Sequence, residues 1–542
     1  MLALPLVAVS FLVLLYRLYR KFTCISVSDI PGPKAESFAL GNLRQYFQSQ
    51  AGEIDFKWQE EFGDIVRYKG AFGEDRLLVS DPKAIQYILQ TGGYRFAKQT
   101  ERREVSRLLS GKGLVWAEGH DHKRQRRIMN PAFGNKESKA FVPLFFYHAA
   151  KLGSKWKDLI FASPDQEPVL DVAGWFSRAT LDAMGIAAFD YHFGTLDNAG
   201  NELGQAYTNL CLDAFGQLST GDILKQTLLP YLPKTLVSYI GKQAVNPRLE
   251  QLRNASVVAT KVAKGMIDSK ADALQDGKGS RDVMSLLVRA NVSENVETRM
   301  SEEEMIAQMR TLLLAGFETT ATTLTWCLLE IARHSGVQNR LRSEIRQKEQ
   351  EIKARGDSEF SASDFDDMPY LTAVLKECLR FHPVAFSTSR EPVMDEVLPL
   401  SKPITTRSGK VLTEIPIPKG IKIVVSVNGY NRHKSVFGPD SHVYDPDRWL
   451  TPGRVGKAAS VGVYGNLLNF AGGVRACIGW RFAVLELQAF IVELISNFEF
   501  SLTPEARMVR REACLIMAPT IEGQLKKTSQ LPLIVKIAKR ET

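Results

Sequence analysis

The chain has 542 residues, of which 44% are hydrophobic and 24% charged, which is enough apolar material for a large core and, by length alone, for several domains. Its formal net charge of +9 suggests nucleic-acid binding as a possible function, but the basic residues are scattered and no nucleic-acid-binding motif accompanies them. Six cysteines, at 24, 211, 327, 378, 477 and 514, form no C-x-x-C pair, which argues against a disulfide framework and suits a reducing compartment.

The first predicted element is an apolar segment at the N-terminus. Residues 1–16 form an unbroken uncharged apolar run, followed by Arg17, Arg20 and Lys21. About 16 to 19 such residues can cross a thin bilayer. A cleaved signal peptide is the alternative, but it normally begins with basic residues and ends at a small-residue cleavage site. We therefore predict a membrane anchor over 1–19, and the positive-inside rule leaves the rest of the chain in the cytosol.

The body of the chain is predicted to be mainly α with small β-sheets. Residues 65–69 and 76–80 are rich in branched apolar side chains, which favours strands, and Asp81-Pro82 then begins a helix over 83–89. Helical periodicity runs through 138–158, 171–189, 200–217, 247–270 and 336–354. Strand character returns at 397–400, 411–425 and 531–537.

The longest predicted helix begins at a capping box, Ser301 to Glu304. No proline interrupts the following stretch, so a helix of about 34 residues, roughly 50 Å long, is expected. Its middle, 312–329, is apolar enough to resemble a membrane span. Glu318 argues against a span, because an ionisable group there would be costly in lipid and is more often functional.

A shorter helix is predicted over 370–381. It carries Glu377 and Arg380, which lie three residues apart on one face and can pair. Such a pair is usually a solvated surface contact of little energetic worth. A further arginine, Arg448, follows in the segment Pro446-Asp-Arg-Trp449 and can complete a network with them.

The last motif is the loop Phe470-Ala-Gly-Gly-Val-Arg-Ala-Cys-Ile-Gly479, which leads into an apolar helical stretch, 480–498. Its glycines permit a turn that brings backbone amides near the sulfur of Cys477, while Arg475 and the helix N-terminus favour the thiolate. A buried structural thiol is the alternative. Five fixed residue types in ten positions favour a metal ligand instead.

These motifs together resemble the cytochromes P450, the haem-thiolate monooxygenases. The matching elements, in chain order, are Ala315-Gly-Phe-Glu-Thr319 for [AG]-G-x-[DE]-T, Glu377 and Arg380 for E-x-x-R, Pro446 to Trp449 for P-x-R-[FW], and Phe470, Gly473, Arg475, Cys477 and Gly479 for F-x-x-G-x-R-x-C-x-G. The segment 122–134 is similar to that of fungal microsomal members. No nicotinamide or flavin segment is visible, so electrons are expected from a separate protein.

The resemblance implies a role for each matching residue. Cys477 would be the axial thiolate of haem b, held in a loop with Phe470, Gly473, Arg475 and Gly479. Arg126 matches the propionate-binding arginine of a W-x-x-x-R helix in which His122 replaces the tryptophan, and Arg390 matches a second such arginine. Glu318 and Thr319 would deliver protons, and Ala315 with Gly316 would leave room for dioxygen. Glu377, Arg380 and Arg448 would form a structural network beneath the cysteine loop.

The resemblance also implies the organisation and partners of the protein. The anchor over 1–19 would be followed by a basic linker and Pro-Gly-Pro hinge over 20–33 and by one haem domain over 34–542, facing the cytosol from the endoplasmic reticulum membrane. NADPH-cytochrome P450 reductase is the expected electron donor and cytochrome b5 a further one. Lys123, Arg124 and Arg127 fit a solvated helix face, and with Arg481 they form a hypothetical docking patch for an acidic redox partner.

The implied activity is insertion of one oxygen atom from O2 into a lipophilic small molecule. A terpenoid or other secondary metabolite is the preferred substrate, and fatty acids, sterols and aromatic xenobiotics remain open. The pocket walls are expected at 108–115, 207–218 and 384–388 and along the apolar face of the long helix. The alternatives are a haem-thiolate isomerase or dehydratase that needs no reductase, and a non-catalytic haem or sterol carrier.

Overall fold

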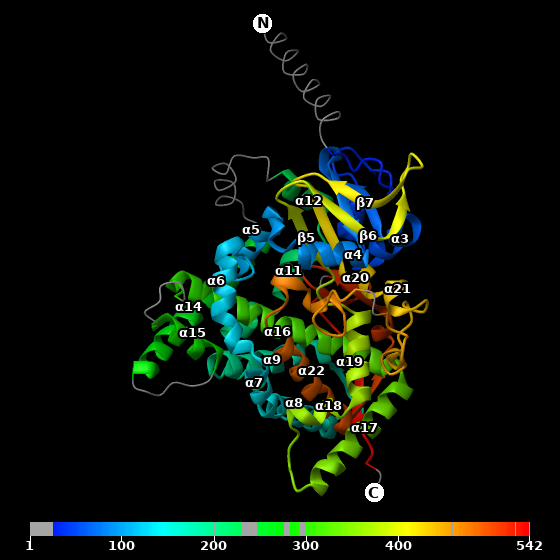
Figure 1. The fold of residues 1–542 in the computed structure, drawn as a ribbon. Coiled ribbons are helices and arrows are strands. Elements are labelled where there is room, and N and C mark those ends of the chain that lie inside the picture. Colours follow the sequence, from blue (N-terminus) through cyan, green and yellow to red (C-terminus); the bar gives the residue numbers. More distant parts are fainter. Residues whose placement is uncertain are drawn as a thin grey trace.

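The structure, a computed structural model, describes residues 25–198, 201–207, 209–228, 247–275, 282–292, 299–456, 459–525 and 527–540. The predicted anchor over 1–19 lies outside these residues. In Figure 1 most strands gather at one end of the molecule, and helices fill the remainder. The prediction of a mainly α chain with small sheets is confirmed.

The helices of the described residues have the following bounds: α2 Leu43–Gln48, α3 Glu53–Phe62, α4 Pro82–Gln86, α5 Thr100–Ser110, α6 Gly119–Met129, α7 Asn135–Ala140, α8 Val142–Ala162, α9 Val172–Phe189, α10 Glu202–Tyr207, α11 Leu210–Phe215, α12 Thr220–Leu228, α14 Pro247–Gln275, α15 Val283–Val292, α16 Glu302–Arg333, α17 Ser335–Ala354, α18 Ala362–Asp366, α19 Pro369–Phe381, α20 Val427–Asn431, α21 Lys434–Phe437 and α22 Trp480–Asn497. The predicted helices at 171–189 and 336–354 match α9 and α17 closely.

The largest sheet joins two distant parts of the chain. Its strand order is β1 (Ile65–Lys69), β2 (Asp75–Val79), β8 (Lys422–Ser426), β5 (Ser387–Pro392) and β3 (Phe96–Ala97). β2 and β8 run parallel, whereas the other neighbours are antiparallel. Arg390 pairs with Ile423 in the register of β5 and β8. The sheet therefore brings Arg390 beside the segment that contains β3 and the start of α5.

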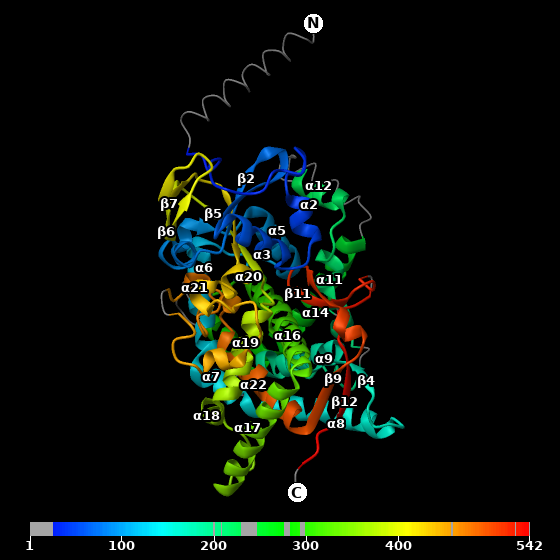
Figure 2. The same cartoon turned by 90° about the vertical axis from the view of Figure 1, so that its right-hand side faces the viewer.

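The smaller sheets lie around the helical body. One contains β4 (Val169–Asp171), β12 (Pro532–Ile537) and β9 (Phe498–Leu502), another pairs β10 (Val509–Ala513) with β11 (Met517–Ile521), and a third pairs β6 (Glu396–Thr405) with β7 (Val411–Ile417). Figure 2 shows β9 and β12 beside α8, away from the large sheet.

Two predicted elements are divided in the structure. The expected strand over 411–425 is β7 and β8 in different sheets, because Pro418 and a left-handed Gly420, with φ 78°, make a turn between them. The expected helix over 200–217 contains α10 and α11, and Asn209 before α11 is also left-handed, with φ 57°. The Asn209 side chain accepts a hydrogen bond from the backbone N–H of Ser529 at 3.0 Å, which fixes this break against the C-terminal part of the chain.

α16 is the central helix of the molecule and crosses the middle of both views (Figures 1 and 2). The predicted capping box is present: the Ser301 hydroxyl accepts from the Glu304 N–H, and the Glu304 carboxylate accepts from the Ser301 N–H. By length and composition α16 is the one described helix that could cross a membrane, but 78% of its most apolar window is buried inside the protein. It is therefore the core helix, and it packs mainly against α9.

Candidate active site

The loop before α22 is held by close backbone contacts. Two 3₁₀ turns, Leu468–Phe470 and Gly473–Arg475, precede Cys477, whose N–H donates to the Phe470 carbonyl at 2.8 Å. Gly473 has φ 67°, and a Cβ atom there would lie 2.0 Å from the Leu89 carbonyl oxygen. A side chain at position 473 is therefore excluded both by conformation and by space.

Cys477 differs from the other cysteines of the described chain. Its side chain is exposed, whereas Cys211, Cys327, Cys378 and Cys514 are buried. Desolvation by the surrounding protein raises the pKa of the Cys477 thiol, while the Gly479 N–H and the charge of Arg126 lower it. An accessible thiol with a nearby cation is suited to metal ligation as a thiolate.

The positive charge beside the sulfur is Arg126 and not Arg475 as predicted. Arg126 of α6 donates from Nη1 to the Ala476 carbonyl at 2.6 Å, one residue before the cysteine. Arg475 forms an ion pair with Glu118 and donates to the Gly93 carbonyl at 3.0 Å. Sequence reasoning missed this partner because Glu118 lies 357 positions earlier in the chain.

The predicted propionate ligands belong to a cluster of cations, which we call the cation cluster. It consists of Lys98, Arg126, Arg390 and Arg475, with Glu118 as the carboxylate that pairs with two of them. Burial and the neighbouring arginines lower the pKa of Lys98 to about 7, and burial, followed by the charge of Arg475, lowers that of Arg390 to about 10. One carboxylate does not balance these charges, so the cluster favours an anionic ligand.

His122 lies in α6 with 2% of its surface exposed. Burial and then the charge of Lys98 lower its pKa to about 4, so the imidazole is neutral at physiological pH. Its Nδ1 is 2.7 Å from the Tyr94 hydroxyl. If Nδ1 accepts from that hydroxyl, Nε2 carries the hydrogen and can donate to a carboxylate.

Two observations in this region fit haem b. The exposed thiol of Cys477 would supply a thiolate ligand for its iron, and the cation cluster would supply partners for two propionates. Lys98 was absent from the predicted set, and nothing in its local sequence marks it. Its Nζ donates to the carbonyls of Val115 and Ala117 at 2.6 and 2.8 Å, which ties it to the segment before α6.

The second part of the site is an accessible window in the middle of α16. Ala315 is exposed and Gly316, Glu318 and Thr319 are half-buried, although most neighbouring residues of the helix are buried. The Thr319 hydroxyl donates to the Ala315 carbonyl at 2.8 Å, which is the back-bonding expected of a helical threonine. α16 is continuous through the window.

Glu318 is a carboxyl without a hydrogen-bond partner among the described residues. Burial raises its pKa to about 7, so both of its protonation states are populated near neutral pH. A group with this pKa can take up and release a proton at physiological pH.

Gly316 has a different surrounding from the one predicted. A Cβ atom at Gly316 would lie 1.9 Å from Cε of Met184 in α9. The glycine therefore allows α9 to pack closely on α16. Gly316 lies about 100° around the helix from Ala315, so the two residues face different neighbours. Ala315 remains as the small residue that faces accessible space.

The predicted structural network is present as a buried cluster. Glu377 accepts from Arg380 Nη2 at 2.6 Å and Nε at 2.8 Å, and Arg448 Nε lies 3.4 Å from it. Trp449 Nε1 and the Asp445 N–H each donate to the same carboxylate at 2.9 Å. The side chains of Glu377, Arg380 and Arg448 are all 0% exposed. The surface-pair alternative is therefore excluded.

The proposed basic patch is smaller than predicted. Arg124 is not a solvated residue: it pairs with Glu304 of α16 and donates to the Arg299 carbonyl at 2.7 Å. Lys123 is exposed, with its ammonium 4.9 Å from the Tyr94 ring centroid. Arg481 lies over Trp480 at 4.2 Å.

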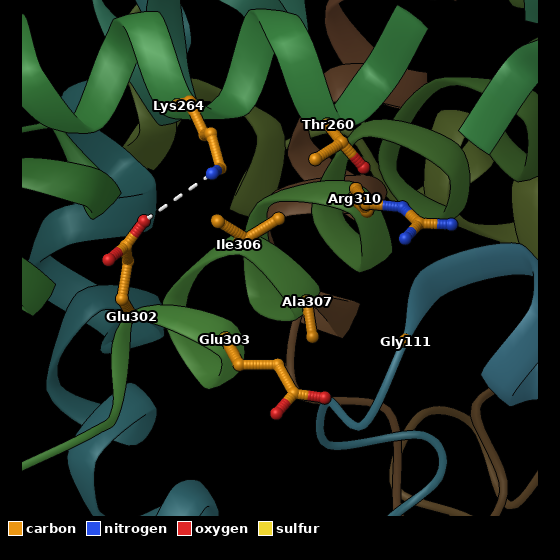
Figure 3. Close-up of a pocket in the computed structure, with 8 residues that line it drawn as sticks. All are labelled: Gly111, Thr260, Lys264, Glu302, Glu303, Ile306, Ala307 and Arg310. Atoms are coloured by element: carbon orange, nitrogen blue, oxygen red, sulfur yellow. Dashed lines mark ion pairs between the residues drawn. The ribbon is translucent and has the colours of Figure 1, made fainter. Parts of the chain in front are cut away.

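A pocket of about 400 Å³ lies between α14, α16 and the residue after α5 (Figure 3). It is lined by Gly111, Thr260, Lys264, Glu302, Glu303, Ile306, Ala307 and Arg310. Gly111 belongs to the predicted wall 108–115, but α14 was not predicted to contribute. Arg310 lies two residues before the apolar run 312–329 of α16 and was not among the predicted site residues.

Comparison with known proteins agrees with this geometry. A family model described as Cytochrome P450 matches residues 31–526. "Cytochrome P450 monooxygenase 205" of Postia placenta is 32% identical over 516 residues, covering 94% of this chain and 92% of the relative. "Cytochrome P450 monooxygenase claP" of Ampulloclitocybe clavipes is 31% identical over 530 residues, covering 94% and 93%.

The fold and the site therefore define a haem-thiolate enzyme. The chain belongs to the cytochrome P450 family, and its class of activity is that of a monooxygenase.

Proposed function

We propose that the protein inserts one oxygen atom from O2 into a lipophilic small molecule, with a terpenoid or another secondary metabolite as the preferred class. The observation that carries the proposal is the exposed thiol of Cys477 beside a cation cluster suited to two carboxylates. The accessible window of α16 supplies the acid and the hydroxyl that this chemistry requires.

Haem held by the Cys477 thiolate would supply the activation of dioxygen when it is bound. The residues of the chain do the rest. Arg126, Arg390, Arg475 and Lys98 would hold the propionates, and neutral His122 would donate to one of them. Glu318 would hold a proton at its carboxyl near neutral pH and pass it to the Thr319 hydroxyl, either directly or through water.

The electron donor in this proposal is NADPH-cytochrome P450 reductase, with cytochrome b5 as a further donor. Lys123, Arg127 and Arg481 are the candidate docking residues, since Arg124 is already paired with Glu304. The anchor over 1–19 would fix the haem domain to the cytosolic face of the endoplasmic reticulum. The basic linker and hinge over 20–33 would separate the two.

The experiment compares wild-type protein with Cys477→Ala and with Cys378→Ala as the matched cysteine control. Membranes that contain protein, reductase and NADPH are incubated with a mixed lipophilic library under ¹⁸O₂. We expect one heavy oxygen in a product from wild type and from the control, and no haem-thiolate carbon monoxide spectrum and no product from Cys477→Ala. An unchanged spectrum in Cys477→Ala would contradict the proposal, and peroxide rearrangement without reductase would support the isomerase alternative.

A further inference from the structure

Arg310 of α16 is a buried cation without a counter-ion among the described residues. It is 8% exposed, and its Nη2 donates to the carbonyls of Leu108 and Leu109 at 3.2 and 2.7 Å. These carbonyls lie at the C-terminal end of α5, so the contact satisfies the hydrogen bonding of one of the three guanidinium nitrogens. Nε is buried with no hydrogen-bond partner. A buried charge that is only partly satisfied is costly, and a ligand anion would complete it.

Among the charged residues that line the pocket, Arg310 is the one without an ion-pair partner in the described part of the chain (Figure 3). Glu302 pairs with Lys264 at 3.8 Å, and Glu303 pairs with Lys112 at 3.5 Å. Both acids of the wall are therefore neutralised without Arg310. A Cβ atom at Gly111 would lie 3.8 Å from Arg310 Nη1. The glycine thus keeps side-chain atoms away from this face of the guanidinium.

Tyr207 of α10 provides a second donor on the same side of α16. Its ring meets Phe317 of α16 edge-on, with centroids 6.1 Å apart, and no described residue hydrogen-bonds its hydroxyl. Burial raises the pKa of Tyr207 to about 12, so the hydroxyl stays protonated, and the charge of Arg310 acts on it. Phe317 precedes Glu318, so Tyr207 connects the Arg310 region with the accessible window.

We infer that the substrate is an amphipathic acid whose carboxylate pairs with Arg310 and accepts a hydrogen bond from Tyr207, while its hydrocarbon body extends along α16 toward Ala315 and Thr319. The guanidinium fork matches a carboxylate in shape and charge. Nine residues separate Arg310 from Thr319, which is roughly 13 Å along the helix axis and, at about 100° per residue, half a turn around it, so the hydrocarbon body curves around α16 on its way to the window. The oxidised carbon therefore lies on the order of 10 Å from the carboxylate. The inference rests on the proposed function and names its substrate class.

The test uses the haem-loaded full-length protein and two pairs of probes: dodecanoic acid and abietic acid, each with its methyl ester. Dissociation constants are measured by calorimetry at pH 7.5, where both acids are ionised. We expect at least one acid to bind roughly ten- to a hundredfold more tightly than its ester. No preference for the acid in either pair, including no binding, overturns the inference.

Three variants test whether Arg310 and Tyr207 contact the ligand or only stabilise the fold. Arg310→Met should abolish the acid preference and leave ester binding unchanged, whereas Arg310→Lys should keep part of it. Tyr207→Phe should weaken acid binding several-fold. As a control, Lys261→Met removes an exposed cation of α14 and should change nothing. Equal loss of acid and ester affinity in Arg310→Met would assign the arginine a structural role only.

The carbon monoxide spectrum of each sample distinguishes a failure of the proposed function from a failure of the substrate inference. A sample without haem-thiolate absorption contradicts the proposed function itself. A sample with full absorption and no acid preference contradicts the substrate inference alone.

Discussion

Replacement of Glu377 by alanine tests whether the buried network holds the fold. The change leaves Arg380 and Arg448, both 0% exposed, without their shared carboxylate. Breaking one buried ion pair costs about 3–5 kcal/mol. The Trp449 indole and the Asp445 N–H lose their acceptor as well, at about 1–3 kcal/mol each. We therefore expect a loss on the order of 5 kcal/mol or more, which is comparable with the whole stability of a typical domain.

Arg340→Ala is the matched control, because it also removes an arginine–carboxylate pair close to this network. Arg340 and its partner Asp447 are 51% and 49% exposed, so the change should cost no more than about 1 kcal/mol. The assay is the soluble folded fraction and the urea midpoint of tryptophan fluorescence. If both variants unfold at the same urea concentration, the assignment of a stabilising role to Glu377 is wrong.

The remaining predictions concern the two sides of the site. Because the pKa of Glu318 is raised to about 7 when folded, its stabilising effect is complete below about pH 4.5 and is lost as pH rises through 7. The unfolding free energy of wild type relative to Glu318→Gln should thus fall by at most about 3 kcal/mol between pH 5 and 8, and a constant difference would refute the raised pKa. Turnover of Glu318→Gln should drop on the order of a hundredfold. Gly473→Ala should lose haem, because its Cβ atom would clash with the Leu89 carbonyl. Gly119→Ala, also at positive φ but in open space, should retain haem. The haem content of the two purified variants tests this prediction.

The features that sequence reasoning predicted well depend on local spacing. The capping box of α16 and the pair of Glu377 and Arg380 each need residues three apart, so a helix places them without further information. That this pair belongs to a structural network was implied by the family resemblance and not by its spacing.

The features that were missed depend on contacts between distant segments. Arg475 pairs with Glu118, and Arg124 with Glu304 across 180 positions, and no spacing rule specifies either. Gly316 was assigned to the oxygen side because its partner Met184 lies on another helix. A single sequence contains the residue types of such contacts but not their pairing.

The cation cluster has a consequence for production of the enzyme. The cations held together around Glu118 repel one another, and a bound dianion relieves that repulsion in the native chain but not in an extended one. Ligands that bind only the native chain stabilise it by mass action. The amount of intact protein recovered from a host cell should therefore rise with the supply of porphyrin precursor during expression.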